Sequence, residues 1–283
     1  MDCPLCASES KFKFKINGFD IHDCVSCNHR FANIKTDEKH VDNTYDDSYF
    51  NDGGAGYSDY LLESDLLYER GKRYAKKMEQ IIGKKGRVLD VGAAAGCILK
   101  GYVDEGWNGV GIEPNHQMAQ YGRKQYNLQI EQGAFESFRP HERFDLVSMI
   151  QVVPHFYEQQ KAFMNASKVL KDDGFLLIES WNRQSISARV FGKSWHEYAP
   201  PSVLHWYSLE GLTIFLKNFG FERVSHGRPS KKISGRHIKS LLEYKIGKNF
   251  MLNMIPEKVN FSYPSEDLFW ALFRKKCTLQ IKD

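Results

Sequence analysis

The stretch RVLDVGAAAG, residues 87–96, decides the fold class of this chain. Its first half is an apolar strand that carries one acid, Asp90. Its second half is a loop of small residues, and such a loop lets the backbone approach a ligand closely. The helix that follows points its N-terminus at the same place, where negative charge is favoured. We therefore expect a ligand at this loop, beyond the carboxyl end of a parallel strand.

Alternating strands and helices continue outward from this stretch. The apolar periodicity predicts strands at 87–91, 109–113, 128–131, 144–153 and 174–180, separated by helices at 98–105, 117–126 and 159–170. A helix at 209–218 and strands at 221–225 and 268–275 follow. This alternation predicts an α/β fold in which helices cover both faces of a mostly parallel sheet.

Composition sets broad limits on the protein class. The chain has 283 residues, a formal net charge of +4, 42% hydrophobic residues and 26% charged residues. These values are ordinary for a globular protein, and the mild positive charge permits phosphorylated or nucleic-acid partners without requiring them. No run approaches the ~18 apolar residues of a membrane span, and the first residues do not resemble a signal peptide. We expect a cytoplasmic protein without a membrane span.

Four of the six cysteines form two close pairs near the N-terminus. Cys3, Cys6, Cys24 and Cys27 have the spacing C-x2-C-x17-C-x2-C. In a reducing compartment this pattern indicates a metal site rather than disulfides. Four thiolates fill a tetrahedral zinc site and leave no open position, so we expect a structural rather than a catalytic zinc. Residues 1–40 are therefore predicted to form a small zinc ribbon.

The remaining chain divides into two further parts. Residues 41–82 contain a connector rich in Tyr, Asp and Gly, followed by a lead-in helix at 61–82, and residues 83–283 form the main domain. That domain carries a basic insertion at about 228–260, in which Glu243 is the only acid between residues 228 and 248. Two interpretations of the insertion remain open. It could bind phosphates of an acceptor, or it could form an amphipathic helix with a solvated lysine face.

Two kinds of nucleotide loop compete for residues 87–96. A dinucleotide fingerprint needs glycines at 92, 94 and 97, whereas this chain has Gly92, Ala94 and Cys97. The pattern D-x-G-x-G-x-G fits in phase, from Asp90 to Gly96, with alanine at the middle glycine. In this respect VLDVGAAAG resembles the first motif of class I S-adenosylmethionine (SAM) methyltransferases. An alanine normally requires a negative φ, so we expect a slightly tighter loop.

The resemblance extends along the domain and implies a Rossmann-like, seven-stranded methyltransferase sheet with SAM as cofactor. Glu113, at the end of GVGIE, would accept the two ribose hydroxyls, and the segment EQGAFESF resembles the one that lines the adenine. The exit loop of the strand RFDLVSMIQVVPHF would lie beside the methionine half of the cofactor. The implied cofactor-binding residues are Asp90, Gly92, Ala93, Ala94, Gly96, Glu113, Pro114, Gln132, Ala134, Phe135 and Gln151.

The tyrosine-rich connector would form a lid over the cofactor in this resemblance. Tyr49 and Tyr57 are the preferred lid residues, with Tyr45 and Tyr60 as further candidates. The alternative is an aromatic contact that only joins the connector to the core.

The segment from residue 181 to residue 221 resembles a smaller group within these methyltransferases. It is similar to a segment of bacterial methyltransferases that often carry an N-terminal zinc ribbon and act on sugars, polysaccharides or natural products. The shared features here are Pro200, Pro201, His205, Trp206, Tyr207 and Ser208. The resemblance implies methyl transfer to a polar small molecule, foremost a sugar or nucleotide-linked sugar, with or without a phosphate.

A hydroxyl acceptor needs a base, whereas a neutral amine needs mainly orientation. His155 is the first candidate because it follows the strand whose exit loop faces the methyl group. His205 is the second candidate and His196 the third. For each of them the alternative is a structural histidine with a hydrogen-bonded ring.

Two other functions remain open. An RNA methyltransferase could use the ribbon as its reader, because KFKFK at residues 11–15 interleaves cations with stacking rings. A steep salt dependence of nucleic-acid binding would favour that function. A non-catalytic protein that binds SAM or a protein partner is the other alternative, and SAM binding without turnover would favour it.

Overall fold

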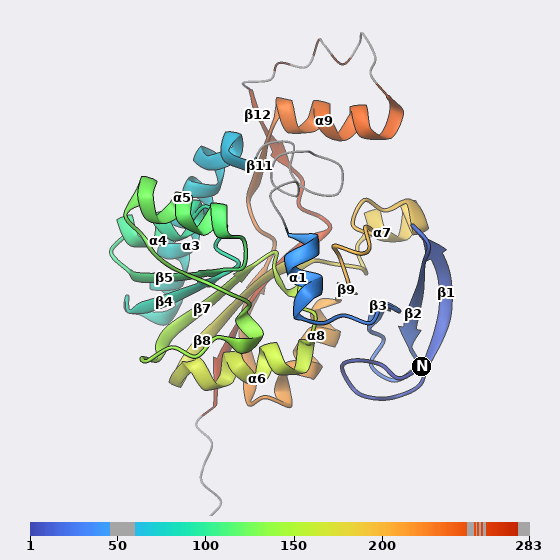
Figure 1. Ribbon diagram of the computed structural model, residues 1–283, viewed down its shortest axis with the longest axis horizontal. Helices are drawn as coiled ribbons and strands as arrows, with labels where there is room; N and C mark the ends of the chain where they lie inside the picture. The colour runs from blue at the N-terminus through green and yellow to red at the C-terminus, as the bar shows by residue number, and fades with distance from the viewer. Residues whose placement is uncertain (46–59, 248–251, 253, 255, 257–258, 277–283) are drawn as a thin grey trace, which may run out of the picture.

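The computed structural model describes residues 1–45, 60–247, 252, 254, 256 and 259–276. A seven-stranded sheet forms its centre, with the strand order β10-β13-β8-β7-β4-β5-β6 (Figure 1). The strand β13 runs antiparallel to both of its neighbours, β10 and β8, and the other strand pairs of this sheet are parallel. The strands are β4 (Arg87–Val91), β5 (Asn108–Glu113), β6 (Gln129–Gln132), β7 (Phe144–Ile150), β8 (Leu170–Trp181), β10 (Phe221–Gly227) and β13 (Leu268–Lys275). The predicted α/β methyltransferase-like sheet is confirmed.

Helices cover both faces of the sheet because successive residues of its strands point to opposite sides. Val88 packs with Tyr74 and Tyr102 on one face, and Leu89 belongs to the core with Phe163 on the other. The side chains of Val88 and Leu89 are both fully buried, which explains why β4 has apolar residues on both of its faces. The covering helices are α3 (Ser64–Ile82), α4 (Cys97–Asp104) and α5 (His116–Tyr126) on one side, with α6 (Gln159–Val169) and α8 (Leu209–Lys217) on the other.

The N-terminal segment forms the antiparallel strands β1 (Ser10–Ile16), β2 (Phe19–Cys24) and β3 (Arg30–Ala32). A fourth strand, β9 (His205–Trp206), comes from the far end of the chain and pairs with β3. The segment is therefore continuous with the main domain in this structure, and it shares buried contacts between Ile21 and Trp206. The boundary at residue 40 remains a prediction, but the ribbon does not stand apart from the domain.

The basic insertion forms the hairpin strands β11 (Lys231–Ser234) and β12 (Asn260–Tyr263) around the helix α9 (Gly235–Ile246). This agrees with the helical interpretation of the segment. Short helices α1 (Glu38–Thr44) and α7 (Ile186–Phe191) lie between the sheet and the ribbon, and η1 (Tyr60–Glu63) leads into α3 (Figure 1). None of the described helices is both long and apolar enough to cross a membrane.

Candidate functional site

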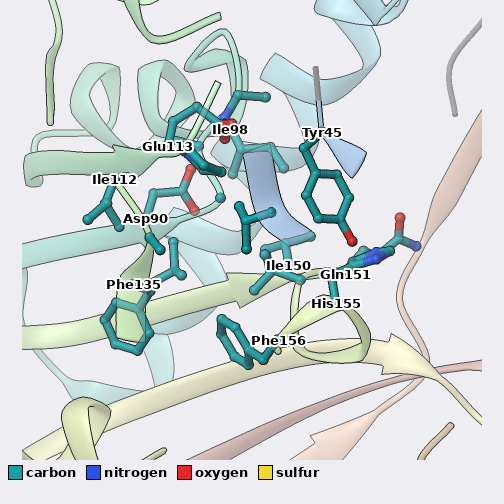
Figure 2. Close-up of a pocket in the computed structure, with 18 of the residues that line it drawn as sticks. Tyr45, Asp90, Ile98, Ile112, Glu113, Phe135, Ile150, Gln151, His155 and Phe156 are labelled. Atoms are coloured by element: carbon teal, nitrogen blue, oxygen red, sulfur yellow. The ribbon is translucent and has the colours of Figure 1, made fainter. Parts of the chain in front are cut away.

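A pocket opens beyond the carboxyl ends of β4, β5 and β7, where an open α/β sheet places its ligands. It encloses about 1050 Å³ of empty space, part of it open to solvent. Figure 2 shows Asp90 and Glu113 toward one end and Tyr45, Gln151 and His155 toward the other. Its lining is Val41, Tyr45, Tyr60, Leu67, Arg70, Asp90, Val91, Gly92, Ala93, Ala94, Ile98, Ile112, Glu113, Pro114, Gly133, Ala134, Phe135, Glu136, Ile150, Gln151, Val152, His155 and Phe156.

The loop after β4 is held by its neighbouring strand. The amides of Gly92 and Ala93 both donate to the carbonyl of Ile112, at 2.9 and 3.1 Å. Ala94 has a φ of +47°, so our expectation of a negative φ was wrong. The loop keeps the left-handed conformation that a glycine would adopt there, because the amide of Ala94 must point at Glu113. The alanine therefore adds a methyl group without changing the course of the backbone.

Glu113 closes this loop from β5. Its Oε2 accepts from the Ala94 amide and its Oε1 accepts from the Asn115 amide, both at 2.8 Å. Burial raises the pKa of Glu113 to about 7, although both amides oppose that rise. Each carboxylate oxygen can accept a second hydrogen bond. A buried, pocket-lining acid of this kind fits a ligand that offers paired hydroxyls, as the ribose of SAM does.

Asp90 is the second buried acid of the pocket. Burial, opposed by a hydrogen bond with Ser148 and aided by the nearby charge of Glu113, raises the pKa of Asp90 to about 7. An acid whose folded pKa is raised contributes stability at low pH that is lost as the pH rises through the folded pKa. As the pH rises from 5 to 8, we therefore expect the ionisation of Asp90 to lower the free energy of unfolding of the ligand-free protein by about 3 kcal/mol.

The measurement is urea unfolding of the wild type and Asp90→Asn at the two pH values. The free energy of unfolding of Asp90→Asn, relative to that of the wild type, should rise by this amount from pH 5 to pH 8. The control is Asp65→Asn, which removes an exposed acid. Its free energy of unfolding should change between pH 5 and pH 8 by the same amount as that of the wild type. Parallel pH dependence in wild type and Asp90→Asn would contradict the prediction.

The predicted adenine segment lies partly in the pocket. Ala134, Phe135 and Pro114 line it, and their contact with adenine stays a prediction. Gln132 does not line it, and its side-chain oxygen lies 2.8 Å from the ring of His116 instead. Gly96 is also outside the lining. Its φ is +78° and it precedes α4, so it serves the turn into the helix.

Two of the four tyrosines that are candidates for the lid lie among the described residues. Tyr45 and Tyr60 line the pocket from the connector and from η1. Tyr49 and Tyr57 lie outside the described residues. Their role as lid residues stays a prediction.

His155 lies at the end of the pocket opposite Glu113, on the exit loop of β7 (Figure 2). Its Nδ1 is 2.7 Å from the carbonyl oxygen of Ser202, and the hydroxyl of Tyr45 donates to the same carbonyl at 2.6 Å. Because a carbonyl only accepts, Nδ1 carries the proton and Nε2 is the basic nitrogen of the neutral ring. Burial lowers the pKa of His155, and the carbonyls of Ser202 and Gln151 oppose this.

The other two histidines do not reach the pocket lining. His205 lies on β9, where its Nδ1 is 3.0 Å from Nε2 of the buried His29. Burial lowers the pKa of His205 to about 3, against the carbonyl of Phe156. His196 packs edge-on against Trp181 at 4.6 Å between ring centres. The prediction that His205 or His196 acts as the base is therefore corrected, because both rings serve packing and positioning. His155 remains as the base candidate.

A buried ion pair beside the pocket was not predicted from the sequence. Arg70 of α3 lines the pocket and pairs with Glu179, whose side chain is fully buried in β8. The hydroxyl of Tyr74 donates to the same carboxylate. An acid inside a buried strand needs a cationic or donor partner. The acid in LLIES was the available signal, but nothing in the sequence pointed to Arg70 as its partner.

Glu136 is a second missed residue. It is buried in the pocket wall, and burial raises its pKa to about 7. Its Oε1 accepts from the amide of Tyr157 at 3.1 Å. The acid therefore fastens the adenine segment to the exit loop that carries His155.

The four predicted zinc ligands come together at one point. The sulfur atoms of Cys3, Cys6, Cys24 and Cys27 all lie within 4.8 Å of one another. Three of the separations are 3.4 to 3.6 Å, close to the ~3.8 Å between sulfurs that bind one zinc at about 2.3 Å. The donor set and its spacing fit a tetrahedral zinc.

Comparison with known proteins gives the same picture as the pocket. A family model described as a methyltransferase domain matches residues 65–226. A ubiquinone biosynthesis O-methyltransferase of a Bradyrhizobium species is 24% identical over 175 residues, which cover 55% of this chain and 68% of the relative. A second, from Bradyrhizobium diazoefficiens, is 24% identical over 47% of this chain and 60% of its own length. The matches thus span about two thirds of these relatives.

Solved structures share the fold at low identity. The YcgJ protein of Bacillus subtilis has a TM-score of 0.53 at 16% identity, covering 74% of this chain and 99% of its own. The N-methyltransferase NodS of Bradyrhizobium japonicum, in complex with S-adenosyl-L-homocysteine, has a TM-score of 0.51 at 15% identity, covering 78% and 94%. Because the family model spans more than half of the sequence, the chain belongs to the methyltransferase-domain family and is a SAM-dependent methyltransferase.

Proposed function

We propose that this enzyme methylates a hydroxyl group of a polar small molecule, most simply a sugar or a nucleotide-linked sugar. The observation that carries the proposal is the hydrogen bond from His155 Nδ1 to the Ser202 carbonyl. It leaves Nε2 as the basic nitrogen of a ring that lines the pocket. A hydroxyl needs such a base, whereas an amine acceptor does not.

SAM, when bound, supplies an electrophilic methyl group on a sulfonium. Glu113 would hold the ribose of the cofactor, and the backbone of the loop at Gly92 would lie against the cofactor. Phe135 would face its adenine. His155 would accept the proton of the acceptor hydroxyl as the new carbon–oxygen bond forms and the carbon–sulfur bond breaks. A lowered pKa keeps His155 neutral and ready to accept that proton at neutral pH.

The sugar assignment is supported by the segment that supplies the Ser202 carbonyl. This is the same Pro200–Ser208 region that resembles sugar- and polysaccharide-modifying methyltransferases. A second candidate acceptor is a phenol, because the ring of Tyr45 packs edge-on against His155 at 5.6 Å between ring centres and gives this end of the pocket an aromatic wall. The names of the ubiquinone-pathway relatives favour the same candidate.

We further propose that the four cysteines hold a structural zinc. Cys3 and Cys24 are buried in the core, and all four sulfurs are committed to one cluster. Zinc would fix the two knuckles against β9 and the exit loop. The side chain of Gln160, at the start of α6, donates to the carbonyl of Pro4 in the first knuckle at 3.2 Å.

The test of the proposed reaction is transfer of radiolabelled methyl from SAM to a panel of nucleotide sugars, simple phenols and ribosomal RNA. His155→Gln should lower the rate about 10²- to 10⁴-fold, because it removes the base. Its affinity for S-adenosylhomocysteine should change less than about threefold, since His155 lies at the far end of the pocket from Glu113.

The exposed His141 gives a matched control, and His141→Gln should keep the wild-type rate. A full rate in His155→Gln would remove the base from the proposal. Label in RNA alone would replace the small-molecule acceptor by the RNA alternative, and binding without label in any acceptor would favour a non-catalytic role.

A further inference from the structure

The helix α7 presents large apolar side chains to solvent. Ile186, Val190 and Phe191 are 67%, 74% and 61% exposed, although the helix has only six residues. Single exposed apolar residues are common on protein surfaces, but three neighbouring ones mark a binding surface. Two cations, Arg189 and Lys193, are exposed beside them.

This orientation is built into the fold. The inner side of α7 is fixed by the buried Ala188 and by the Ser185 cap on its amide, at 2.9 Å. Glu266 adds a second anchor, because its carboxylate accepts from the amide of Ile186 at 2.6 Å and from Ser187. The apolar residues therefore cannot turn inward without breaking these hydrogen bonds.

The basic insertion begins next to the same anchor. Arg228 directly follows β10, whose last residue Gly227 pairs with Trp270 of β13, and Glu266 lies two residues before β13 begins. Arg228 and Lys232 are both exposed. From residue 228 to residue 248 the sequence has seven Lys or Arg residues and one acid. Positive charge thus continues from α7 into the insertion.

We propose that α7 and the start of the insertion dock on the surface of an anionic phospholipid bilayer. The docking patch consists of Ile186, Arg189, Val190, Phe191, Lys193 and Arg228. Apolar side chains flanked by cations are the composition of an interfacial membrane contact, in which the rings enter the headgroup region and the cations meet lipid phosphates. Nucleic acid would use the cations, but it would leave the aliphatic Ile186 and Val190 without a role.

The patch lies on the same edge of the sheet as the pocket. The helix α7 follows β8 at the carboxyl edge of the sheet, and this is the edge at which the pocket opens. The docking itself does not depend on which acceptor the pocket takes, so it is tested without one.

The experiment is co-sedimentation of the full chain with vesicles of phosphatidylglycerol mixed with phosphatidylcholine, at low and at physiological salt. We expect binding that falls at high salt and is absent with pure phosphatidylcholine. Val190→Ser with Phe191→Ser should weaken binding at least about tenfold, because it removes two of the three exposed apolar side chains of α7. Arg189→Glu with Lys193→Glu should weaken it about tenfold or more.

Ile214→Ser and Lys217→Glu provide matched controls on α8, where Ile214 is 60% exposed. Both should bind vesicles as the wild type does. S-adenosylhomocysteine binding by every variant checks that the fold is kept. Absence of vesicle binding, or equal binding by the Val190 and Phe191 double variant, would overturn the proposal. RNA binding that only the charge variant loses would assign the cations to nucleic acid instead.

Discussion

Calorimetric titration with S-adenosylhomocysteine should show micromolar binding by the wild type and a loss of at least about a thousandfold in the Gly92→Arg, Glu113→Ala double variant. Gly92 has a φ of +67°, and a Cβ there would lie 2.5 Å from Cγ2 of Val152. An arginine would therefore distort the loop and enter the pocket. Loss of Glu113 would remove the proposed acceptor for the ribose hydroxyls, and it leaves the amides of Ala94 and Asn115 without their partner.

Two controls separate a lost site from a lost fold. Glu131→Ala removes an exposed acid from the neighbouring strand β6 and should bind like the wild type. Melting curves of the double variant should still show one cooperative transition. Wild-type affinity in a folded double variant would mean that the cofactor binds elsewhere, and it would remove the basis for the assigned roles of the pocket residues.

The second large effect concerns the cysteine cluster. The purified chain should contain one zinc, and Cys24→Ser should lose it together with at least about 3 kcal/mol of unfolding free energy. The effect is large because Cys24 is buried in the same core cluster as Phe31 and Tyr207. Loosening the knuckles would thus also disturb the packing around β9.

Zinc content by atomic absorption and urea unfolding provide the measurements. Cys97→Ala is the matched control, since Cys97 is an equally buried cysteine at the start of α4. Its zinc content should remain one per chain. A full zinc complement in Cys24→Ser, or a metal-free wild type that unfolds at the same urea concentration, would contradict a structural zinc.

The central strands of the main sheet could be predicted because β4, β7 and β13 are buried on both faces and are therefore rich in apolar residues. The strand β4 has the predicted bounds, and the terminal strand β13 does as well. The strand β8 begins at Leu170 rather than at 174, because Leu170 already pairs with Phe144 of β7, and Asp173, with a φ of +60°, lies in the irregularity before pairing resumes at Phe175. Ala94 and Asp173 both show that the fold can hold a non-glycine residue in the left-handed region, which residue type alone does not reveal.

The candidate site was predictable where it depends on local sequence. Asp90, Gly92 and Glu113 lie at strand ends, and the order of the strands brings such ends together. The partners of buried charges come from distant segments, so periodicity did not indicate that Arg70 would meet Glu179. The same limit applied to His205, whose neighbour His29 is 176 positions away.

The pairing of β3 with β9 also imposes an order on synthesis. The ribbon leaves the ribosome first, yet its fourth strand is His205–Trp206. At about 5 to 20 residues per second, the edge of β3 waits roughly 10 to 35 s for that partner. During this interval the nascent segment has no β9 to cover Phe31, and its thiols are the groups that can hold it together. Zinc capture by the growing chain would then precede the formation of the catalytic pocket.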